Sequence, residues 1–171
     1  NPKYAEDIDL LISQVKKCGD ILKKLSNRKI VDDQYVSNIS FQDLLYEIVK
    51  SFENISEKEI SLNTDKAKKK IPIKRTAELT YGIRNFIGNA VKFSKSKIQI
   101  TLANNRDDKT ITLSIKDDGP GFPEDIIKNI GEPYIFSKEK NLKSKSGLGL
   151  GTFIGKTLLE RKKAYIDFYN D

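Results

Sequence analysis

Six apolar residues near the start of the chain recur at alternating steps of three and four. They are Ile8, Leu11, Val15, Cys18, Leu22 and Leu25. This heptad spacing predicts a helix over residues 4–26 with an apolar seam, which Ile12 and Ile21 widen on its flanks. A lone helix of this length is marginal in water, so the seam has to pack against another helix. We therefore expect it to pair with a second copy of the chain or with a segment outside this sequence.

The composition excludes several classes of protein. The 171 residues contain one cysteine and no histidine. This excludes an intramolecular disulfide, a histidine metal ligand, a Ser-His or Cys-His nucleophile pair and a phosphorylated histidine within these residues. The net charge of +7 suits nucleic acid, anionic lipid or a polyphosphate ligand equally well.

The remaining periodicity predicts an α+β fold. The expected elements are helices over 40–53, 75–94 and 152–162, and strands over 57–63, 98–102, 111–115 and 164–168. Strict alternation in the two middle strands, with a polar loop between them, predicts an antiparallel hairpin. Helices packed on such a sheet form a two-layer α+β sandwich. We expect a helical arm over 1–28, a linker over 29–39 and the sandwich domain over 40–171.

Two amides and a lysine are candidate functional residues on the helix expected over 75–94. Asn85, Asn89 and Lys92 follow one another at i, i+4 and i+7, so they share one side of the helix, away from its apolar stripe. Amide oxygens are suitable Mg²⁺ ligands when phosphates and waters complete the octahedron. The alternative is an ordinary solvated helix face.

Two glycine-rich motifs are further candidates. Asp117-Asp118-Gly119-Pro120-Gly121-Phe122 directly follows a predicted strand. It forms either a simple turn or a place where backbone and a carboxylate approach a flat ligand closely. Ser146-Gly147-Leu148-Gly149-Leu150-Gly151-Thr152 opens a helix and follows the lysines of 138–145. Free N–H groups at a helix start attract anions, although this motif alone is a weak signal.

In this order and spacing, the three motifs resemble the N, G1 and G2 boxes of the ATP-binding domain of sensor histidine kinases. Glu132-Pro133-Tyr134 stands where that family has its F box. The resemblance covers residues 40–171 and implies the Bergerat-type ATP-binding sandwich. The arm resembles the second helix of the family's dimerisation and phosphoacceptor hairpin. Residues 13–22 and 155–161 most resemble the redox-responding RegB/PrrB type.

The resemblance implies that the domain binds ATP with Mg²⁺. Asn89 would coordinate Mg²⁺, while Asn85 and Lys92 would act at the phosphates as the catalytic residues. Phe93 would lie against the adenine, and Asp117 would accept a hydrogen bond from the adenine amino group. The other residues implied to contact ATP are Gly119, Gly121, Tyr134, Gly147, Leu148 and Gly149.

The resemblance also implies a mobile ATP lid over 128–146. Lys145 departs from the glycine with which many relatives begin the G2 box, and the F box lacks its usual leading phenylalanine. After Phe168 the sequence stops before the final strand of the family. The phosphoaccepting histidine would lie upstream of Asn1, because these residues contain none.

The expected function is therefore that of a two-component sensor histidine kinase catalytic domain. It would transfer the ATP γ-phosphoryl group to a histidine outside this sequence, for relay to the receiver domain of a response regulator. We expect a homodimer through the helical hairpin and a cytoplasmic location, as part of an inner-membrane sensor kinase. We expect no membrane contact by these residues and no nucleic acid partner.

Three alternatives remain open at the level of sequence. Hydrolysing ATPases of the same fold carry a glutamate general base where this chain has Asn85, and an amide has no such basicity. A serine kinase of this fold would not need the heptad arm, so the presence of the arm argues against that class. A basic nucleic-acid-binding module would need exposed aromatic residues among its lysines and arginines.

Cys18 is either a small packed side chain of the seam or a redox switch through an intermolecular disulfide.

Overall fold

A computed structural model describes residues 38–67, 69–105, 110–132 and 150–170, together with five residues near the N-terminus. The chain divides into two units, Asn1–Val36 and Ser37–Asp171. In the first unit the described residues are helical and exposed; they are Ile8, Ile12, Ser13, Val15 and Lys16. The other positions of the predicted seam, including Cys18, lie outside the described residues.

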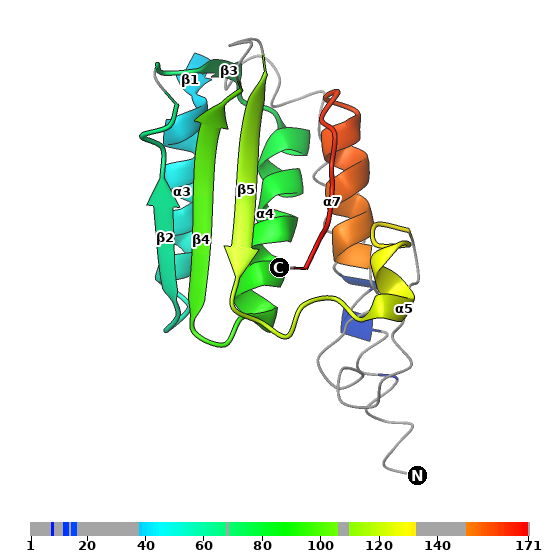
Figure 1. Ribbon diagram of the computed structural model, residues 1–171. Helices are drawn as coiled ribbons and strands as arrows, with labels where there is room; N and C mark the ends of the chain where they lie inside the picture. The colour runs from blue at the N-terminus through cyan, green and yellow to red at the C-terminus, as the bar shows by residue number, and fades with distance from the viewer. Residues whose placement is uncertain are drawn as a thin grey trace. The chain divides into compact units, whose positions relative to one another are not determined.

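The second unit is a two-layer α+β sandwich, which confirms the predicted fold class. Its elements are β1 (Asn38–Ser40), α3 (Phe41–Glu53), β2 (Glu59–Asn63), β3 (Pro72–Lys74), α4 (Ala77–Phe93), β4 (Lys97–Asn104), β5 (Ile111–Asp117), α5 (Glu124–Ile127) and α7 (Leu150–Glu160). Figure 1 shows α3 and α4 against one face of the sheet formed by β2, β4 and β5, with α7 beside α4.

The alternating sequence of β4 explains its central place in the sheet. This strand pairs in parallel with β2 and antiparallel with β5, so that Ile100 lies opposite both Leu62 and Ile115. Its inward side chains Ile98, Ile100 and Leu102 are fully buried against the helices. Because alternate side chains point to opposite faces, the polar residues between them lie on the other face. The predicted hairpin over 98–102 and 111–115 is confirmed.

Local caps determine where the two large helices begin. The Ser40 hydroxyl accepts a hydrogen bond from the Asp43 N–H at 3.1 Å, and the Thr76 hydroxyl accepts one from the Leu79 N–H at 3.3 Å. Each bond satisfies one of the backbone donors that a helix start leaves unpaired. The apolar side of α3 then buries Leu44, Leu45 and other residues under the sheet. Both helices lie within two residues of their predicted bounds.

Two very short strands are absent from the sequence prediction. β1 overlaps the end of the linker expected over 29–39. β3 lies between the strand expected over 57–63 and the helix expected over 75–94, where no element is expected. They pair antiparallel with each other, with Ile39 opposite Ile73. Strands of three residues contain too little alternation to be recognised in a sequence. Their pairing is decided by the packing of Ile39 and Ile73 against the core.

The strand predicted over 164–168 is wrong. Lys163 adopts a left-handed conformation with φ of 63°, and the Ala164 N–H donates back to the Leu159 carbonyl, which ends α7. The following residues to Asn170 join neither sheet in the part of the chain that the structure describes. Side chains hold this segment instead, because Ile166 packs against the core and the Phe168 ring lies 5.8 Å from the Phe86 ring of α4.

Candidate functional site

The polar side of α4 is covered by α7. Small residues permit this close approach: a Cβ on Gly155 would lie 3.1 Å from the Asn85 Cβ, and one on Gly82 would lie 2.5 Å from the Leu159 Cγ. Asn85 and Asn89 are consequently half-buried. The helix side that carries the amides therefore faces a second helix rather than open solvent.

Both amide groups are oriented by hydrogen bonds from their nitrogens. Asn85 Nδ2 donates to the Tyr81 carbonyl at 2.8 Å, and Asn89 Nδ2 donates to the Thr152 hydroxyl at 2.9 Å. A Cβ on Gly151 would lie 3.5 Å from Asn85 Oδ1 and 3.8 Å from Asn89 Oδ1. Both carbonyl oxygens thus lie beside the first turn of α7.

The two amide oxygens fit a cation whose other ligands are phosphate oxygens. Amide oxygens are hard ligands of the kind that Mg²⁺ accepts, and Mg²⁺ usually keeps several ligands from water and substrate phosphates. Among the described residues no group of three or more His, Cys, Asp or Glu could hold a metal ion by itself. A cation between the two helices would therefore depend on oxygens that an anionic ligand brings.

The turn after β5 lies against the end of α4. A Cβ on Gly119 would lie 2.7 Å from the Phe93 carbonyl oxygen and 2.5 Å from Asp117 Oδ1, so this position has no room for a side chain. Asp117 Oδ1 accepts the Gly119 N–H at 2.8 Å, and the Asp117 side chain is exposed. The structure thus places an exposed carboxylate beside a glycine that packs closely against the end of α4.

Asp118 anchors this turn, a role that sequence reasoning missed. Its carboxylate accepts the N–H groups of Lys95 at 2.8 Å and Ser96 at 3.0 Å, and the Ser96 hydroxyl at 2.7 Å. The backbone N–H of Ser96, followed by that of Lys97, holds the pKa of the Asp118 carboxyl well below its ordinary value. The carboxylate therefore connects the α4–β4 turn to the end of β5. The adjacent pair of aspartates was the available sequence signal.

Some of the remaining predicted site residues lie among the described residues and the others do not. Lys92 is exposed, and its Nζ lies 5.1 Å from the centroid of the half-buried Phe93 ring at the end of α4. Gly121 has φ of 75° and belongs to the turn after β5. The other predicted ATP contacts lie outside the described residues; they are Tyr134, Gly147, Leu148 and Gly149. The predicted lid is described only through Glu132.

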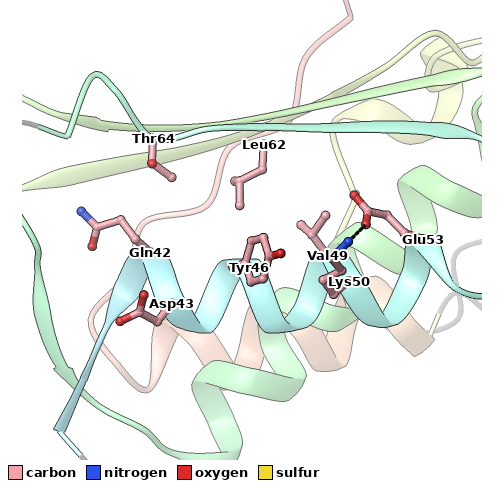
Figure 2. Close-up of a pocket in the computed structure, with 8 residues that line it drawn as sticks. All are labelled: Gln42, Asp43, Tyr46, Val49, Lys50, Glu53, Leu62 and Thr64. Carbon is pink, nitrogen blue, oxygen red and sulfur yellow. Dashed lines mark ion pairs between the residues drawn. The ribbon is translucent and has the colours of Figure 1, made fainter.

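A separate groove of about 400 Å³ lies between α3 and β2. Figure 2 shows its walls, with Tyr46 and Val49 on the helix and Leu62 on the strand, and with an ion pair of 3.2 Å between Lys50 and Glu53 at one end. None of the residues that line the groove belongs to the amide pair or to the turn after β5. The candidate site is therefore distinct from this groove.

The sequence comparisons identify the domain. Residues 75–170, more than half of the chain, match the family described as histidine kinase-, DNA gyrase B- and HSP90-like ATPase. The sensor histidine kinase RegB of Cereibacter sphaeroides is 32% identical over 99% of this chain, which covers 38% of RegB. The sensor protein kinase PilS of Pseudomonas aeruginosa is 29% identical over 54% of this chain and 17% of its own length.

Solved structures agree with the fold. The catalytic domain of histidine kinase ThkA superposes with a TM-score of 0.57 at 19% identity, over 74% of this chain and 81% of that one. The chain spans about two fifths of the length of the RegB relative. In the part of the chain that the structure describes, no helix has the length and apolar character that crossing a membrane requires. The chain belongs to the family of histidine kinase-, DNA gyrase B- and HSP90-like ATPases, and the relatives that it resembles within this family are sensor histidine kinases.

Proposed function

We propose that this chain is the ATP-binding catalytic part of a two-component sensor histidine kinase. It would bind ATP with Mg²⁺ and transfer the γ-phosphoryl group to a histidine outside these residues. The observation that carries the proposal is the meeting of the Asn85 and Asn89 carbonyl oxygens with the first turn of α7. That arrangement combines hard oxygen ligands with the start of a helix of eleven residues, which favours negative charge.

The phosphate end of ATP would lie between α4 and α7. Asn89 would provide an oxygen to Mg²⁺, and Mg²⁺, when bound, would reduce the negative charge of the phosphates. Asn85 lies one helical turn before Asn89 and would support the same end of the nucleotide. Lys92 is exposed on the following turn and carries the positive charge that a phosphate attracts.

The adenine would lie at the other end of the site, beside the turn after β5. The exposed Asp117 carboxylate can accept a hydrogen bond from the adenine amino group. Gly119 is needed beside it, because the Cβ of any other residue would strike the Phe93 carbonyl and displace the turn that carries Asp117. The Phe93 ring supplies an apolar surface for the base. Asn89 and Phe93 are one turn apart on α4, about 6 Å along the helix axis, a spacing that suits two neighbouring parts of one nucleotide.

Phosphoryl transfer fits this site better than ATP hydrolysis does. Hydrolysis needs a group that takes a proton from the attacking water, and the amide of Asn85 cannot serve as a general base. Transfer to a side chain depends instead on positioning and on charge stabilisation, which amides, lysine and a cation provide. The acceptor histidine has to come from another segment or subunit, because these residues contain none.

The N-terminal arm supports a proposed homodimer. Ile8, Ile12 and Val15 are each at least half exposed on helical residues, so a partner helix could bury them. The receiver domain of a response regulator would then take the phosphoryl group from the histidine. We place these residues in the cytoplasm, where ATP is available, as part of an inner-membrane sensor kinase. The redox role of Cys18 stays a prediction.

Two measurements test the proposed function. Calorimetric titration of the chain with ATP should show binding that Mg²⁺ strengthens, and Asn89→Ala should lose mainly the part that depends on Mg²⁺. In the second, radiolabelled ATP and a histidine-bearing helical hairpin are added to the chain. Acid-labile label should appear on the hairpin and not on the chain. Absence of ATP binding, or acid-labile label on the chain itself, would contradict the proposal.

A further inference from the structure

The side-chain amide of Asn170 forms two hydrogen bonds with the backbone of Phe122, which precedes it by 48 residues. The Phe122 N–H donates to Asn170 Oδ1 at 2.8 Å, and Asn170 Nδ2 donates to the Phe122 carbonyl at 2.8 Å. Each end of the amide therefore meets its complementary group, as in a pair of antiparallel strands. Reversing the amide would place like groups against each other, so only one orientation forms both bonds.

The glycine before Phe122 makes room for this contact. Gly121 has φ of 75°, a region that side chains disfavour, and a Cβ built there would lie 2.8 Å from Asn170 Oδ1. A residue other than glycine would thus strain the turn and push the amide away. Gly121 and Asn170 fit together as two parts of one contact.

The segment that carries Asn170 is itself fixed to the sandwich. The Phe168 ring lies 5.9 Å from the Phe122 ring, edge to face, and 5.8 Å from the Phe86 ring of α4. Ile166 packs against the hydrophobic core. Figure 1 shows this segment returning past α7 and ending beside α4. Asn170 therefore connects a packed segment to a turn whose own residues are largely exposed.

We propose that Asn170 is a positioning residue for the adenine end of the nucleotide site. By holding Phe122 and Gly121, it keeps the turn after β5 in the conformation that presents Asp117 and Gly119. This inference rests on the proposed ATP site and adds a residue that belongs to none of its motifs. Without the two bonds the turn would have to be ordered when ATP binds, and that ordering weakens affinity.

The test compares Asn170→Ala with Tyr169→Ala, because Tyr169 is the exposed neighbour on the same segment. Hydrogen exchange of the Phe122 amide in the ligand-free chain reports on the contact directly. Calorimetry then measures the affinities for ATP and for inorganic tripolyphosphate. Asn170→Ala should exchange faster at Phe122 and bind ATP about tenfold more weakly, with unchanged affinity for tripolyphosphate. Tyr169→Ala should change none of the three.

A second variant covers poor folding of the alanine substitution. Asn170→Asp keeps an acceptor for the Phe122 N–H but sets a carboxylate oxygen against the Phe122 carbonyl, so it disrupts the same contact without truncating the side chain, and its ATP affinity should also fall. Faster exchange at Phe122 with unchanged ATP affinity in both variants would overturn the positioning role, as would equal weakening of ATP and tripolyphosphate. A wild-type chain that binds no ATP would instead refute the proposed function itself.

Discussion

The side chains of Asn89 and Thr152 are joined by a hydrogen bond of 2.9 Å between residues that are 63 positions apart in the sequence. The amide nitrogen of Asn89 donates and the Thr152 hydroxyl accepts. Because the nitrogen is engaged in this way, the other end of the amide, Oδ1, is the end that lies near Gly151. In the proposed site, this bond would leave Asn89 Oδ1 as the atom that faces a cation.

Replacing Thr152 by valine removes the acceptor and preserves the shape of the side chain. We expect Thr152→Val to weaken the binding of ATP in the presence of Mg²⁺ by about fivefold, the equivalent of one ordinary hydrogen bond of about 1 kcal/mol. Binding measured with EDTA should be unchanged. Thr152→Ser keeps the hydroxyl and should bind like the wild type. Equal weakening with and without Mg²⁺ would show that Thr152 does not act through the cation ligand.

Asp117→Asn tests the adenine contact. The substitution removes the negative charge of the acceptor, and hydrogen bonds to charged groups contribute about 1.5–3 kcal/mol. Calorimetry should therefore show ATP affinity falling by at least about tenfold, with little change for tripolyphosphate. Asp65→Asn, an exposed aspartate after β2, is the matched control and should have no effect. Unchanged ATP affinity in Asp117→Asn would move the adenine contact elsewhere.

The lowered pKa of Asp118 predicts that part of the chain's stability is lost in acid. Its pKa is lowered in the folded chain from the ordinary value of 3.8, because its carboxylate accepts backbone N–H groups. The unfolded chain therefore binds the proton more tightly, so the stabilisation is fully present well above pH 3.8 and is lost as pH falls through the folded pKa. Urea unfolding between about pH 2 and 5 should give a shallower slope for Asp118→Asn than for the wild type. If the free energy of unfolding changes with pH equally in both proteins, this contribution of Asp118 is excluded.

Gly82 and Gly88 form a matched pair on α4. A Cβ on Gly82 would lie 2.5 Å from the Leu159 Cγ of α7, whereas one on Gly88 would have its nearest contact at 3.5 Å from Phe52 Cζ. We expect Gly82→Ala to lower the free energy of unfolding by about 1–3 kcal/mol through overpacking. Gly88→Ala should raise it by up to about 1 kcal/mol, because alanine favours helix more than glycine does. Urea denaturation measures the free energy of unfolding of both variants. If the two substitutions change it in the same direction, the close α4–α7 packing is contradicted.

Local patterns in the sequence determined the main elements of the sandwich. The helical spacing of apolar residues and the hydroxyl of Ser40 define α3, and strict alternation defines β4 and β5, because these signals depend on neighbours within a few residues. The motif residues on α4 and after β5 are likewise recognised from neighbours within a few residues. Their order along the chain was sufficient to suggest the family before any contact between them was known.

Tertiary structure alone decided how these pieces meet. β1 and β3 are too short to show a period. Among the described residues, those from Tyr165 to Asn170 join neither sheet, because Ile166 and Phe168 pack the segment against the core and α4. The bonds from Asn89 to Thr152 and from Phe122 to Asn170 join residues that no local pattern relates. Periodicity specifies which side of an element is buried, but which polar groups pair depends on the approach of helices and turns that are distant in sequence.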